Sequence, residues 1–164
     1  MLSFFVILLA ILILVLIDNV RLRRRVRFDC VTHVYTRDVF ENTLKRLVKN
    51  HSQFAIITID CDNFKAVNDV YGHKAGDQVL RMVAAYLKEN VRPYDLVARV
   101  GGDEFAILLR DCYDVQSVTN RILDFEYFGV TLSCGHATSN DNEPLVLSDM
   151  RMYECKRSHH SRMR

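Results

Sequence analysis

Proline and glycine are scarce in this chain, whose 164 residues include two prolines and six glycines. The sequence has no internal repeat, no low-complexity tract and no linker rich in either residue. These absences argue against a repeat array or a string of domains joined by flexible linkers. Residues 29–164 suffice for one domain around one hydrophobic core and leave no length for a separate sensory module.

Cysteine pairs with metal-binding or redox spacing are also absent. The five cysteines are Cys30, Cys61, Cys112, Cys134 and Cys155, and they form neither a Cys-x-x-Cys pair nor a zinc-binding pattern. In a reducing cytoplasm we expect them to be small, buried apolar residues.

Positive charge is concentrated in one short segment. The chain has a formal net charge of +2, and residues 18–27 contain five arginines and one aspartate. Without that segment, residues 29–164 carry a net charge of about −2, which is no electrostatic footprint for DNA or RNA. We therefore expect no nucleic-acid partner.

The first 17 residues lack charge altogether, and Ser3 is their single polar residue. We interpret residues 1–20 as a membrane anchor helix and residues 21–28 as a basic juxtamembrane linker. A span needs about 20 apolar residues and at least about 17, so this one spans only if snorkelling arginines extend it; the alternative is a segment lying in the membrane. The arginines follow the apolar run, which disfavours a cleaved signal peptide and predicts a single-pass protein of the bacterial inner membrane with its domain in the cytoplasm.

The spacing of apolar residues predicts an α+β domain. Helices are expected over residues 37–49, 64–70, 76–89, 115–125 and 147–157, and strands over 54–59, 95–100, 105–109 and 130–137. Gly101 and Gly102 lie between two strands and are typical of a tight hairpin turn in which both central residues have positive φ. Helices crossing a central antiparallel sheet form an α+β sandwich.

Acidic residues gather at the ends of two of these strands. Asp60 and Asp62 follow the strand over 54–59, and Asp103 and Glu104 follow the glycine pair. Magnesium binds oxygen ligands, often one or two carboxylates plus substrate phosphates, so Asp60 and Asp103 suffice on the protein side and imply a nucleoside triphosphate. The alternatives are a cap on the next helix for Asp60 and Asp62, and a solvated turn for Asp103 and Glu104.

Two motifs together resemble the GGDEF domain family, the diguanylate cyclases. They are Asp60-x-Asp62-x-Phe64-Lys65-x-x-Asn68-Asp69-x-x-Gly72-His73-x-x-Gly76-Asp77 and Gly101-Gly102-Asp103-Glu104-Phe105. Further landmarks follow the family's order, namely Asp29 to Thr32 with Arg37 and Phe40, the run 130–135, and Asp149-x-x-Met152-Tyr153-x-x-Lys156. The resemblance covers residues 29–157 and implies a polymerase-palm-like fold within a GGDEF domain over residues 29–164.

The resemblance also implies an activity: two GTP molecules condense into cyclic di-GMP and two pyrophosphates at the interface of a homodimer. It assigns catalysis to Asp103, Glu104 and Arg99. Two magnesium ions, for which manganese can substitute, are then held by Asp60, Asp103 and the backbone carbonyl of Cys61.

The resemblance assigns the nucleotide and product contacts as well. The triphosphate would lie against Asn63, Phe64, Lys65 and Lys156, the guanine against Asn68 and Asp77, and an inhibitory product site would contain Arg92 and Asp95. The residues alone leave other roles open. Asn68 also suits a turn and Asp77 a helix cap. Arg99 also suits a surface salt bridge, and Lys156 an ordinary helix C-terminal cation.

The chain departs from the family pattern near both ends of the resemblance. His159-His160-Ser161 replaces Gly-Arg-Asn, and losing a charged phosphate contact of about 1.5–3 kcal/mol weakens binding roughly 10- to 150-fold, part of which a protonated His160 would recover. Residues 32–37 lack the family's turn glycine, and the stretches 105–130 and 137–149 are short. The alternative function is therefore a degenerate domain that binds cyclic di-GMP or GTP without turnover.

Overall fold

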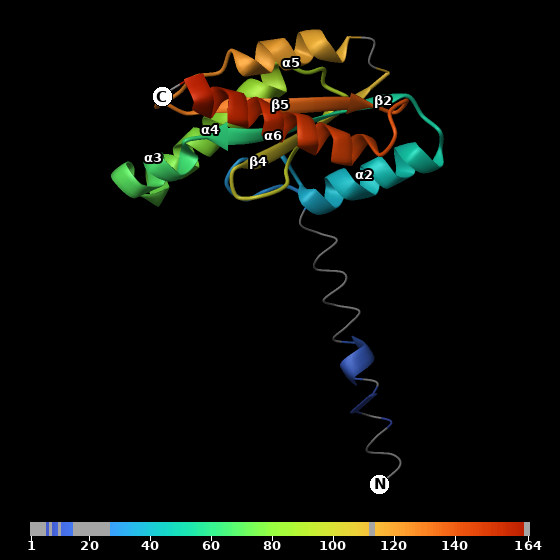
Figure 1. Ribbon diagram of the computed structural model, residues 1–164. Helices are drawn as coiled ribbons and strands as arrows, with labels where there is room; N and C mark the ends of the chain where they lie inside the picture. The colour runs from blue at the N-terminus through green and yellow to red at the C-terminus, as the bar shows by residue number, and fades with distance from the viewer. Residues whose placement is uncertain (1–5, 7, 10, 15–26, 112–113, 163–164) are drawn as a thin grey trace.

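The computed structural model describes residues 6, 8–9, 11–14, 27–111 and 114–162, with side chains up to residue 159 (Figure 1). Its named elements are β1 (Tyr35–Thr36), α2 (Arg37–Lys49), β2 (Phe54–Asp62), α3 (Phe64–Tyr71), α4 (His73–Glu89), β3 (Leu96–Arg99), β4 (Glu104–Arg110), α5 (Val115–Leu123), β5 (Thr131–Thr138) and α6 (Pro144–Arg162). Most of the expected anchor over residues 1–20 lies outside the described residues. Among the described helices, none has the length and apolar content that a membrane crossing requires.

Every helix and strand expected within residues 37–157 is present, most of them with shifted ends. The helix expected to begin at residue 147 begins at Pro144 and continues to Arg162, because proline at the first helical position needs no hydrogen-bond partner for a backbone N–H. The expectation for the cysteines is confirmed for Cys61 and Cys134, which are buried, and wrong for Cys30, which is exposed in the turn before β1.

One five-stranded sheet forms the centre of the domain, in the order β1-β3-β4-β2-β5. Strand β2 lies antiparallel to β4 and β5, and β3 is antiparallel to β4. The expectation of an antiparallel sheet is wrong for β1, which pairs in parallel with β3 through Tyr35 and Ala98. Two residues are too few to reveal a strand by alternation, and parallel pairing needs the long crossover that the intervening helices supply.

Helices cover both faces of the sheet, so all nine residues of β2 are buried. Ile57 and Ile59 point into the larger core, together with Ile107 of β4 and residues from α4 and α5. Ile56 points to the opposite face and packs with Phe40 of α2. Helix α6 lies across β5 and β2 on that second face (Figure 1).

The contact between β5 and α6 depends on Gly135. A Cβ atom at this position would collide with the backbone of α6, at the carbonyl of Ser148 and the N–H of Met152. The glycine therefore lets the helix pack directly against the strand. Its close approach carries the C-terminal half of α6 toward the end of β2.

The expected hairpin is present, but the expectation of positive φ at Gly101 and Gly102 is wrong; the described glycines with positive φ are Gly72 and Gly129. The strands end at Arg99 and Glu104, which leaves a four-residue loop that needs no mirror-image turn. A Cβ at Gly101 would meet the carboxylate of Glu104, whose flexible side chain would have to move.

Candidate active site

The end of β2 and the hairpin loop meet at an edge that we call the metal edge, made of residues 60–62 and 103–104. Asp60 is directly opposite Glu104 in the register of β2 and β4. The N–H of Cys61 donates to the carbonyl of Asp103 at 3.1 Å. Because the N–H and C=O of an extended residue point to the same side of its strand, the carbonyl of Cys61 also faces the loop.

The donors at the metal edge suit magnesium. Within the described part of the chain, no group of three or more His, Cys, Asp and Glu side chains is placed to hold a metal ion. Asp60, Asp103 and one carbonyl form a smaller, all-oxygen set, which suits an ion that takes its other ligands from phosphate and water. Burial raises the pKa of the Cys61 thiol, and Asp103 and Asp60 raise it further, so this residue offers its carbonyl and not a thiolate.

Helix α6 brings a cation to this edge. The Nζ atom of Lys156 lies 2.5 Å from Oδ1 of Asp60. Burial opposes the charge of Lys156, but the hydrogen bond to Asp60 and the charges of Asp60, Asp103 and Asp62 outweigh it and raise the pKa of the lysine. The ammonium group thus lies among the carboxylates of the metal edge, where the resemblance predicts the triphosphate.

Asp62 is the most enclosed carboxylate of the edge, with no exposed surface. It accepts hydrogen bonds from the hydroxyls of Ser133, at 2.9 Å, and Thr131, at 3.2 Å. Nδ1 of His159 lies 3.0 Å from the same carboxylate. The helix-capping interpretation of Asp62 is wrong, because the N-cap position of α3 is Asn63 and no side chain caps that helix.

The turn between β2 and α3 exposes backbone donors. Asn63 adopts a left-handed conformation with φ 61°, and the side chain of Phe64 packs against the main core. The side chain of Lys65 is exposed. The first N–H groups of a helix have no intrahelical acceptor, and such groups bind phosphate. This geometry suits the triphosphate contact expected for residues 63–65.

The two expected guanine contacts lie where α3 and α4 meet. Gly72, with φ 80°, separates the helices and donates its N–H to the carbonyl of Asn68. A Cβ at Gly76 would collide with the amide of Asn68, so the glycine brings that amide beside the backbone of residue 76. Asp77 is the next residue along α4. The structure therefore places the Asn68 amide beside the residue that precedes Asp77, and the joint guanine contact of the two residues stays a prediction.

Arg99 braces the hairpin. Its guanidinium lies 3.1 Å from the carboxylate of Asp29 and donates to the carbonyl of Gly102 at 2.6 Å. Burial disfavours the charge of Asp29, but hydrogen bonds from Thr32 and Arg99 outweigh this and lower its pKa. The salt-bridge alternative for Arg99 is present, and its contact with the transferred phosphate stays a prediction.

The expected product site is at the opposite end of β4 from the metal edge. The carboxylate of Asp95 accepts from the N–H groups of Arg92 and Arg110, each at 3.0 Å. A pocket of about 450 Å³ opens beside this turn, and Arg92, Arg110 and Arg121 line it. Nε of Arg110 is buried without a hydrogen-bond partner among the described residues. Asp95 thus holds the turn together while the arginines present positive charge.

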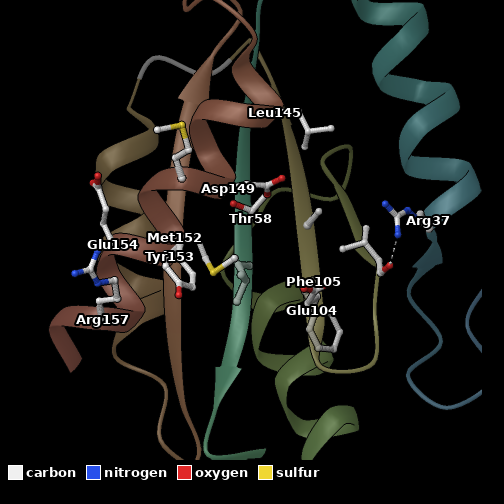
Figure 2. A pocket seen from close by; sticks show the side chains of 14 residues that line it. Arg37, Thr58, Glu104, Phe105, Leu145, Asp149, Met152, Tyr153, Glu154 and Arg157 are labelled. Atoms are coloured by element: carbon white, nitrogen blue, oxygen red, sulfur yellow. Dashed lines mark hydrogen bonds between the residues drawn. The ribbon is translucent and has the colours of Figure 1, made fainter. Parts of the chain in front are cut away.

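Sequence reasoning missed a groove of about 600 Å³ between α2 and α6. It runs over the sheet from Glu104 to Leu145, and Figure 2 shows Thr58 and Asp149 pointing toward each other inside it. Burial raises the pKa of Asp149. The sequence did carry a signal for this groove, namely the large apolar residues Met150 and Tyr153 in the last helix. The structure leaves both side chains exposed.

Comparison with known proteins identifies the class that this fold and site define. The family model described as "Diguanylate cyclase, GGDEF domain" matches residues 26–162. The chain therefore belongs to the GGDEF family, as the two motifs predicted.

Individual relatives agree with this assignment. The chain is 32% identical over 147 residues to the diguanylate cyclase DgcS of Shewanella oneidensis, covering 80% of this chain and 50% of that protein. The isolated GGDEF domain of TpbB from Pseudomonas aeruginosa has a TM-score of 0.73 and 33% identity, covering 80% and 89% of the two chains. The GGDEF domain of DgcB from Caulobacter crescentus, in complex with cyclic di-GMP, has a TM-score of 0.66 and 26% identity, covering 80% and 91%. The chain spans half or less of the length of these curated relatives.

Proposed function

We propose that this protein is a diguanylate cyclase that condenses two GTP molecules into cyclic di-GMP with release of two pyrophosphates. The observation that carries the proposal is the convergence at one edge of the carboxylates of Asp60, on β2, and Asp103, on the hairpin loop, with a helix-start turn and the Lys156 ammonium group. A binding module needs no such set around the triphosphate. Membership of the GGDEF family supports the same reaction.

In this proposal, different residues of the site hold the metal ions, bind the triphosphate and take part in catalysis. Asp60, Asp103 and the carbonyl of Cys61 would hold magnesium, which when bound neutralises developing phosphate charge and eases deprotonation of the attacking hydroxyl. Backbone N–H groups at residues 63–65 and the ammonium of Lys156 would fix the triphosphate. The resemblance assigns catalysis to Asp103 on the hairpin loop and to Glu104 at the start of β4, where a 3′-hydroxyl from a second subunit would arrive.

Base selection would fall to Asn68 and Asp77. Guanine presents an acceptor at O6 and donors at N1 and N2, which an amide and a carboxylate can pair with together. Adenine reverses this pattern, so a site built for guanine leaves its own groups unpaired when adenine enters.

The proposed reaction needs two subunits, because each active site binds one GTP and each 3′-hydroxyl attacks the other's α-phosphate. Catalysis is then chiefly positioning and electrostatics. A membrane anchor within residues 1–20, at the bacterial inner membrane and with the domain in the cytoplasm, would raise the local concentration of the homodimer. We propose this location on the sequence pattern alone.

Product inhibition is the regulation that the second pocket supports. Cyclic di-GMP carries two phosphates, and Arg92, Arg110 and Arg121 supply positive charge around a cavity that is remote from the metal edge. The buried Nε of Arg110 is a donor suited to such an anion.

The test is product formation from GTP and magnesium by full-length protein in detergent, with Asp103→Ala and with Glu126→Gln as an exposed acidic control. We expect cyclic di-GMP from the parent and the control, and at least about 100-fold less from Asp103→Ala. The variant should fold, because the hydrogen bond of residue 103 to β2 uses its backbone carbonyl. A folded, dimeric parent that forms no product would favour the alternative, a domain that binds cyclic di-GMP or GTP without turnover.

A further inference from the structure

The last turns of α6 are fastened to β2 by two pairs of side chains. We infer that His159, which occupies the position of the family's glycine, is a positioning residue that fixes the end of α6 and thereby the reach of Lys156 toward the triphosphate. This inference rests on the proposed function and adds to it a residue specific to this chain.

Two side-chain contacts, which we call the first and the second rung, join α6 to β2. Asp60 and Asp62 are two apart on β2 and so face the same side of the strand. Lys156 and His159 are three apart on α6 and so face the same side of the helix. The first rung joins Lys156 to Asp60 at 2.5 Å, and the second joins Nδ1 of His159 to Asp62 at 3.0 Å.

The second rung provides the buried carboxylate of Asp62 with a hydrogen-bond donor, His159. Asp62 is completely enclosed, and a buried carboxylate is costly unless it is paired and hydrogen-bonded. Ser133 and Thr131 donate hydroxyl hydrogen bonds to it but bring no charge. An imidazole whose Nδ1 carries a proton supplies the remaining donor.

The imidazole ring is held from more than one side. Nδ1 also lies 3.3 Å from the hydroxyl of Ser133 on β5. Nε2 lies 3.9 Å from Sγ of Cys155, four residues earlier on the same helix. The ring is therefore wedged between β2, β5 and its own helix. A glycine at this position would leave all of these contacts unmade.

Lys156 lies less than one turn before the wedged ring, so its position follows that of the helix end. If α6 loosens, the ammonium group spends less time at the metal edge, both before and during the reaction. Equal loss in the ground state and transition state raises KM and leaves kcat nearly unchanged. We expect a KM for GTP about tenfold higher when the second rung is removed, which corresponds to losing one charge-assisted contact.

The experiment compares His159→Ala, His159→Asn and Arg157→Ala in full-length protein. The Asn amide can place a donor near the position of Nδ1, and Arg157 is an exposed basic residue of the same helix. The readouts are kcat and KM for cyclic di-GMP formation, the affinity for a non-hydrolysable GTP analogue with magnesium, and the melting temperature.

We expect His159→Ala to raise KM and to weaken analogue binding about tenfold, Asn to restore at least half of the affinity on a logarithmic scale, and Arg157→Ala to change neither. A His159→Ala protein with normal affinity, or one whose kcat alone falls along with its melting temperature, would overturn the inference. Analogue binding separates the two proposals, because it reports on His159 even if the parent forms no product.

A second variant covers the case in which His159→Ala does not fold. In the double variant Asp62→Asn with His159→Ala, no buried charge is left unpaired, and an asparagine oxygen still accepts from Ser133. The inference expects weak analogue binding from this folded protein. Affinity equal to that of the parent would overturn it.

Discussion

The metal edge and the turn at residues 92–95 lie at opposite ends of β4 and are built in opposite ways. At the metal edge, Asp60, Asp103 and Lys156 come from three parts of the sequence and are held by burial and pairing. At the turn, Arg92 and Asp95 are three residues apart and bond to each other locally. The pocket beside the turn is completed by Arg110 of β4 and Arg121 of α5. None of its lining residues comes from α6, whereas the metal edge depends on that helix for Lys156.

Gly135→Ala should give the largest effect, because it breaks one site and spares the other. The new Cβ must push α6 away from β5, and overpacking of this kind costs about 1–3 kcal/mol of unfolding free energy. We expect a lower denaturation midpoint in urea and loss of GTP-analogue binding, while binding of cyclic di-GMP at the turn persists. Gly102→Ala is the control for stability, since a Cβ there has open space. Equal loss of both ligands would contradict the division into two sites.

Lys156→Ala should weaken the metal edge without moving the fold. It removes a triphosphate contact of about 1.5–3 kcal/mol, so we expect KM for GTP to rise roughly 10- to 150-fold. Arg157→Ala is the matched control on the same helix. Steady-state kinetics of product formation measure the effect, and isothermal titration with cyclic di-GMP checks that the turn is unaffected. Unchanged KM would mean that Lys156 serves only to neutralise Asp60.

The same contrast explains what could be predicted from the sequence. Helix α2 and strand β2 follow from apolar spacing, and the fold brings Asp60, Asp103 and Lys156, which the resemblance named, to one edge. The capping interpretation of Asp62 failed because its partners, Ser133 and His159, are about 70 and 97 residues away. The prediction of positive φ at Gly101 and Gly102 failed because loop length, and not glycine content, selects the turn type.

Arg92→Ala should reverse the pattern seen with Lys156→Ala. Removing one of the arginines around the pocket at the turn should weaken cyclic di-GMP binding about tenfold and relieve inhibition at high product concentration. The initial rate without product should stay at the parental value, because Arg92 is remote from the metal edge. Arg46→Ala, an exposed arginine on α2, is the control. A loss of initial rate would show that the two sites are coupled.

Asp29→Asn should give the smallest effect, because it acts on the support of the hairpin loop next to the metal edge. The variant weakens the brace between Asp29 and Arg99 behind the hairpin loop, and we expect a loss of about 1 kcal/mol of unfolding free energy at pH 7. Because the folded pKa of Asp29 is lowered from 3.8, the carboxylate stabilises the parent above that pH and loses this contribution as pH falls through the folded pKa. Urea denaturation at neutral and acidic pH should therefore show the gap between parent and variant closing in acid. A gap that is constant down to acidic pH would place the stabilisation in the shape of the side chain and not in its charge.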